Sequence, residues 1–149
     1  MASPELKFDV NTELAARRTG MSLQRTRMSA DRTLMSVIRT SLSLIGFGFT
    51  IFQFFQRLRE QDVITKAASA RNFGLALVVL GVLMLIIGII YHIQFMLGLR
   101  QLRDSMRREG LVHGESVFPV SLTLITAVVL LIIGVAAIVS MAFQVGPFG

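Results

Sequence analysis

An Arg-Thr pair recurs every seven residues in the first third of the chain, and each pair is followed by Met-Ser or Leu-Ser. The unit R-T-x-[ML]-S-x-x occurs four times in register, with its arginines at Arg18, Arg25, Arg32 and Arg39. Guanidinium groups bind phosphate and carboxylate oxygens bidentately, and hydroxyl groups can add further donors. The residue types of the repeat therefore indicate a site for anions.

The spacing of the repeat is that of a helix. Seven residues are close to two turns, so the four arginines are expected to form a ladder about 30 Å long on one face. If several copies met around an axis, this ladder could line an anion site or path. Heptad spacing also suits helix packing, and arginines beside a membrane contact lipid phosphates. The sequence leaves these two interpretations open.

The elements that must position the repeat are membrane helices. Hydrophobic residues make up 53% of the chain and charged residues 16%, against about 25% charged in soluble domains, and the mean hydropathy is +0.67. Apolar segments at 34–55, 73–99 and 117–143 each reach the ~20 residues needed to span a bilayer. We predict an all-α fold, an integral membrane three-helix bundle, preceded by an amphipathic basic cytoplasmic helix.

The predicted organisation is a flexible cytoplasmic tail at 1–11 and a membrane domain at 12–149, with the amphipathic helix at 12–33. Thr12 to Phe55 is expected to form one long helix, or two joined near Arg32. The first thirty residues lack the apolar region of a cleavable signal, so the first span is expected to direct insertion.

The distribution of basic residues predicts the orientation. With the N-terminus inside, eleven of the fifteen Lys and Arg residues lie on the cytoplasmic side. We therefore expect a multi-pass protein of the cell inner membrane, with its N-terminus cytoplasmic and its C-terminus outside.

A second basic cluster follows the second span. Arg100, Arg103 and Arg107 share a helical face, and Asp104 can pair with a neighbouring arginine. They could close an anion-binding ring with Arg32 and Arg39, or they could simply set the membrane topology.

Two polar residues have alternative roles. Asp31 could orient a basic residue on a neighbouring helix, or it could pair with Arg27 four residues earlier. His92, inside the second span, could relay a proton or serve as a polar contact between helices.

A glycine stripe lies in the second span. Gly74, Gly81 and Gly88 repeat at seven residues, which predicts close packing against another helix.

Signatures of catalysis and of metal binding were not found. The chain has no Cys, no phosphate-binding loop and no H-E-x-x-H motif, and no metal cluster can be assembled from its residues. We therefore expect no enzyme, no catalytic residue, no metal site and no cofactor. The net charge of +6 does not predict nucleic acid binding, because the sequence contains no signature of a nucleic-acid-binding module.

The stretch Met28–Ser43, MSADRTLMSVIRTSLS, resembles the signature of the YidH-like bacterial inner-membrane family, a domain of unknown function with three spans. Asp31 stands at the family's acidic position, and Arg32, Thr33, Arg39 and Thr40 at its Arg-Thr pairs. Met-Ser replaces Leu-Ala, and Val37 stands where an aromatic residue is common.

That family is similar to the small membrane subunit of the vacuolar transporter chaperone, a polyphosphate polymerase complex. The resemblance implies that Arg32 and Arg39, at the start of the first span, help to conduct polyphosphate. The chain departs from that complex in having no polymerase domain and no phosphate-sensing domain. Its repeat also extends upstream to Arg18.

These observations predict a small oligomeric inner-membrane protein that binds or conducts an anion such as phosphate or polyphosphate. A homo-oligomer is expected because three helices enclose little space. The alternative is a structural or regulatory membrane subunit whose arginines contact lipid head groups or a partner protein. A third possibility is an accessory subunit of an enzyme.

Overall fold

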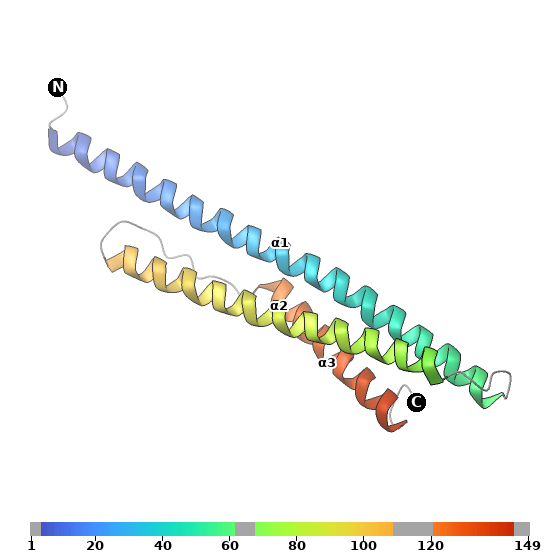
Figure 1. Ribbon diagram of the computed structural model, residues 1–149. Coiled ribbons are helices and arrows are strands. Elements are labelled where there is room, and N and C mark those ends of the chain that lie inside the picture. The colour runs from blue at the N-terminus through green and yellow to red at the C-terminus, as the bar shows by residue number, and fades with distance from the viewer. Residues whose placement is uncertain (1–3, 62–67, 109–120, 145–149) are drawn as a thin grey trace.

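The computed structural model describes residues 4–61, 68–108 and 121–144, and these residues form three helices with no strand among them. The helices are α1 (Pro4–Glu60), α2 (Ala68–Arg108) and α3 (Leu122–Phe143) (Figure 1). All three are long and apolar enough to cross a membrane. The prediction of an all-α membrane protein is confirmed.

The first helix is continuous over its 57 residues, or about 85 Å. The predicted long helix is thus a single element, and it has no joint near Arg32. It begins at Pro4 rather than Thr12, so residues 4–11, expected as a flexible tail, are helical; proline is favoured in a first helical turn because its N–H would have no partner there. Since the hydrocarbon core is ~30 Å thick, much of α1 must project beyond it.

The second and third helices differ from their predicted spans at the ends. The 41-residue α2 extends past the apolar segment 73–99 in both directions, because polar flanking residues continue the helix into the aqueous phase. The 22-residue α3 begins after Ser121, and the predicted first residues 117–120 of that span lie outside the described part of the chain.

Glycines bring α1 and α2 into close contact. A Cβ atom on Gly74 would lie 2.7 Å from the carbonyl oxygen of Gly48, and one on Gly81 would lie 3.1 Å from the carbonyl oxygen of Ser41. A Cβ on Gly88 would lie 2.7 Å from the Val37 side chain. The predicted packing role of the α2 glycine stripe is confirmed, and its partner is α1.

Two apolar clusters join all three helices. One lies around Leu34 and Leu85, and it includes Leu130 of α3. The other lies around Phe52 and Val78, and it includes Met141 of α3. The start of α3 therefore contacts the start of the α1 span, and the end of α3 contacts the end of the α1 span. Thus α3 runs parallel to α1 and antiparallel to α2 (Figure 1).

The bundle leaves large apolar side chains uncovered. In α3, Leu122 is 78% exposed, Ile132 64% and Phe143 72%. Such surfaces are disfavoured in water and are normal on helices that face lipid or a neighbouring membrane helix.

Candidate functional site

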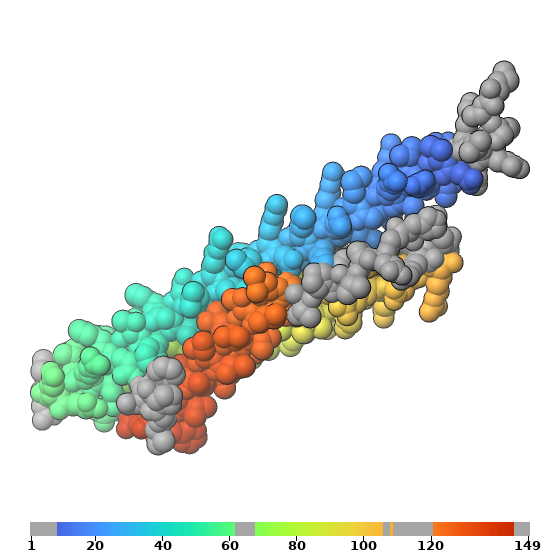
Figure 2. Space-filling view, turned by 180° about the vertical axis from the view of Figure 1, so that it is seen from behind, coloured from blue at the N-terminus to red at the C-terminus, as the bar shows by residue number. Residues whose placement is uncertain are grey.

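The four repeat arginines all lie on the outer face of α1. Its inner face is marked by Leu34, Ile38 and Ser41, which are buried against the other helices. Figure 2 shows side chains of α1 standing out at regular intervals along the edge away from α2 and α3. The exposed residues Arg18, Arg25, Arg32 and Arg39, here called the arginine stripe, form that outer face.

Among the described residues, no carboxylate pairs with the arginine stripe. The nearby Glu13 instead forms an ion pair with Arg17, whose Nη2 lies 2.7 Å from Oε1 of Glu13. The stripe therefore presents four unneutralised guanidinium groups to the surroundings of the protomer.

The threonine hydroxyls of the repeat serve the helix and are not available as donors to an anion. Each donates a hydrogen bond to the backbone carbonyl four residues earlier, at 2.9–3.1 Å, as in Thr26 to Ser22 and Thr33 to Ser29. The expectation that these hydroxyls add donors is not met for threonine, because each hydroxyl already donates within its own helix. The exposed guanidinium groups are the charged donors that the repeat presents.

An exposed apolar row runs beside the arginine stripe. It occupies the heptad position three residues after each arginine and continues one heptad upstream to Leu14. We call it the apolar row; its members are 39–60% exposed and comprise Leu14, Met21, Met28, Met35 and Leu42.

The continuous helix fixes the position of each arginine along the axis relative to the apolar stretch. Arg39 lies about 8 Å inside the apolar stretch that begins at Leu34, so its long side chain can reach the interface. Arg25 lies about 14 Å and Arg18 about 24 Å outside it. A head-group layer of about 5–8 Å beyond Leu34 would include Arg32 and leave Arg18 well outside it.

A polar cluster joins the three helices where α1 leaves the bundle. Asp31 of α1 accepts a hydrogen bond from the Ser121 hydroxyl at 3.0 Å, and its Oδ1 lies 3.7 Å from Nε2 of His92 on α2. His92 is 3% exposed, and neither ring nitrogen has a hydrogen-bond partner among the described residues.

This cluster bears on two predictions. The structure brings Asp31 next to a basic residue of a neighbouring helix, as one interpretation of Asp31 expected, and His92 contacts another helix. Ser121 was not predicted. As the N-cap residue of α3 it is of a type common at helix starts, but nothing in its spacing connects it to Asp31.

The second basic cluster does not meet the arginine stripe within one protomer. Arg100 and Asp104 are exposed on the extension of α2, and Asp104 forms no ion pair with any described side chain. The side chain of Arg107 lies outside the described part. Because the stripe faces away from α2, a ring that combines it with Arg100 and Arg103 would have to form between copies.

The described residues contain no group of three or more His, Cys, Asp and Glu side chains that could hold a metal ion. The geometry of the site is thus cationic and apolar, with one histidine-carboxylate contact.

The central part of the chain is similar to a known family. Residues 25–98 match the family model described as DUF202, a domain of unknown function. The DUF202 segment contains Arg25, Arg32 and Arg39 together with Asp31 and His92, and it ends within α2. It is consistent with the expected YidH-like resemblance, whose motif at 28–43 lies inside it. No curated protein and no solved structure matched the chain.

Proposed function

We propose that this chain forms a homo-oligomer in the inner membrane, with its N-terminus cytoplasmic and its C-terminus outside, and that the arginine stripe binds or conducts a phosphate or polyphosphate anion. It carries out no reaction of its own and binds no nucleic acid. The observation that supports the proposal is the unbroken helix, on which Arg18 lies about 24 Å before Leu34, the first residue of the apolar stretch.

Lipid contact accounts for only part of the arginine stripe. Electrostatic attraction to lipid phosphates decays over a Debye length of ~8 Å. Arg18, about 24 Å from the apolar boundary at Leu34, lies beyond both the head groups and that distance. A soluble polyanion, in contrast, can contact arginines repeated at intervals of about 10 Å along the whole helix.

The apolar row supports assembly of several copies. Leu14, Met21 and Met28 are 48%, 53% and 60% exposed on a part of α1 that precedes the apolar span. Apolar residues at heptad spacing on such a helix are buried when copies pack side by side. This packing would bring stripes of neighbouring copies close together, and a bound anion would then offset their mutual repulsion.

The choice of polyphosphate rests on the resemblance described above, which implies this role for Arg32 and Arg39. Guanidinium forks match phosphate oxygens well, which agrees with that choice.

The alternative function is a structural or regulatory subunit whose arginines contact lipid head groups or a partner protein. The observation in its favour is the position of Arg32 and Arg39, which can both reach the head-group layer from their places beside Leu34.

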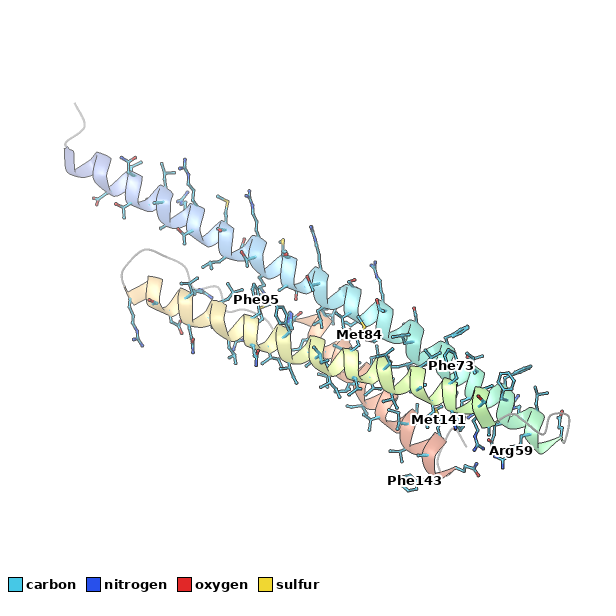
Figure 3. The ribbon with its side chains drawn as sticks, in the orientation of Figure 1. Arg59, Phe73, Met84, Phe95, Met141 and Phe143 are labelled. Atoms are coloured by element: carbon cyan, nitrogen blue, oxygen red, sulfur yellow. The ribbon has the colours of Figure 1, made fainter. Side chains whose placement is uncertain are left out.

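The test is polyphosphate binding to the full-length protein in lipid nanodiscs, with the oligomer mass measured on the same sample. Arg32→Ala and Arg39→Ala should each weaken binding at least about tenfold, since a charge-assisted hydrogen bond contributes about 1.5–3 kcal/mol. Arg59→Ala is the matched control, because Arg59 is exposed in the last turn of the same helix, outside the stripe (Figure 3). Equal binding by all variants, or a monomeric mass, would contradict the proposal.

A further inference from the structure

A groove of about 730 Å³ lies between α1 and α2, and α3 contributes no residue to it. Most of its wall is apolar, including Val37 and Leu44 of α1 and Leu83 and Met84 of α2. Figure 3 shows Met84 and Phe95, which also lines the groove, at the edge of α2 that faces α1.

The groove has the length of one bilayer leaflet. It extends from Leu44 to Ser29 on α1 and from Leu80 to Phe95 on α2, about 22 Å along each helix. Half of a bilayer with its head groups measures about 20–22 Å. The inner end of the groove lies deep in the apolar span, and its outer end lies where α1 leaves the bundle.

The outer end of the groove is polar. Ser29, Tyr91 and His92 line it there. His92 is buried, yet neither ring nitrogen has a hydrogen-bond partner among the described residues. Asp31, the nearest carboxylate, accepts from Ser121 and stays 3.7 Å from the imidazole, which is beyond hydrogen-bond distance. Buried polar atoms are nearly always paired, so the imidazole indicates a ligand atom at this end.

We propose that the groove holds one acyl chain of a membrane phospholipid, and that an ester or phosphate oxygen of this lipid accepts a hydrogen bond from His92. The apolar wall matches the chain, and the polar end lies at head-group depth. A protein helix about 10 Å wide would lie over the opening between α1 and α2, whereas the narrower acyl chain can enter the groove. The groove lies between α1 and α2 and is lined by none of the stripe arginines, so it does not depend on the proposed anion function.

The test counts phospholipids that stay bound to each protomer. The protein is purified from vesicles of phosphatidylethanolamine and phosphatidylglycerol and released from detergent micelles in a mass spectrometer. We expect one retained phospholipid per protomer, and inorganic phosphate should not displace it, because the acyl chain supplies most of the contact.

Two matched variants locate the site. Leu83 and Leu97 are both 51% exposed on α2, but only Leu83 lines the groove. Leu83→Trp should fill the groove and reduce the retained lipid at least fivefold, whereas Leu97→Trp should leave it unchanged. His92→Leu, which replaces the imidazole with an apolar side chain, should also reduce the amount of retained phospholipid. The test therefore does not depend on the folding of a single variant.

The proposal is overturned if the wild-type protein retains no phospholipid, or if Leu83→Trp and Leu97→Trp retain equal amounts. It is also overturned if inorganic phosphate alone displaces the lipid. If the arginine variants lose polyphosphate binding but still retain the lipid, the groove and the arginine stripe bind their ligands independently.

Discussion

Substitution of Gly74 by alanine should separate α1 from α2. The new Cβ would lie 2.7 Å from the carbonyl oxygen of Gly48 and 2.9 Å from the backbone nitrogen of Phe52. Neither backbone atom can rotate away, so the helices must move apart by about 1 Å to reach a normal contact of ~3.5 Å. Overpacking of this kind costs about 1–3 kcal/mol.

Gly98→Ala is the matched control, since a Cβ at Gly98 on the same helix meets nothing within 4 Å. Both substitutions gain the same helix propensity of up to ~1 kcal/mol, so this term cancels between them. The free energy of unfolding, measured by titration with sodium dodecyl sulfate in mixed micelles and followed by circular dichroism, should therefore be about 1–3 kcal/mol lower for Gly74→Ala than for Gly98→Ala. Equal unfolding midpoints would refute the contact between the glycine stripe and α1.

Two further predictions concern single side chains. Asp31→Ala should lower the free energy of unfolding by about 1 kcal/mol, because Ser121 loses its acceptor and His92 its nearest carboxylate. Asp104 is exposed, so Asp104→Ala should change the free energy of unfolding little. An equal loss in both variants would contradict the role of the polar cluster. Thr33→Val should leave polyphosphate affinity within about twofold of wild type, because that hydroxyl already donates to the carbonyl of Ser29. A tenfold loss in equilibrium binding would show that the hydroxyl reaches the anion.

The spans and the main helix packing could be predicted from the sequence because their signals are local and periodic. Long apolar runs predict three membrane helices, and Gly74, Gly81 and Gly88 at heptad spacing predict a close helix contact. The same periodicity placed the four arginines on one face of α1. What periodicity could not supply was the partner of each face, since that depends on how the helices are arranged in space.

The polar cluster shows where sequence reasoning ends. Asp31 and His92 lie 61 residues apart in the chain, and Ser121 lies a further 29 residues on, so no spacing connects them. Their contact follows from the antiparallel course of α2 and the return of α3. The threonine hydroxyls illustrate a different limit, because a residue type that can donate to an anion donates instead to the nearest carbonyl of its own helix.

The helix boundaries differed for a related reason. Apolar runs mark only the part of a helix inside the hydrocarbon, whereas α1 and α2 continue into polar flanks. The extent of α1 matters for the proposed function, because an unbroken helix extends from the apolar stretch to Arg18.

The central claim is that the arginine stripe acts as one anion-binding surface, and it is tested most directly by removing its charges one after another. Arg39, Arg32, Arg25 and Arg18 are replaced cumulatively by Gln in the full-length protein in nanodiscs, and polyphosphate affinity is measured at several salt concentrations. Binding by a polyanion releases counterions in proportion to the contacts made, so both the affinity and its salt dependence should fall at every step. The control Arg57→Gln/Arg59→Gln should match wild type. A series in which the removal of Arg25 and Arg18 changes nothing, or in which the control loses as much as the stripe, would contradict the account.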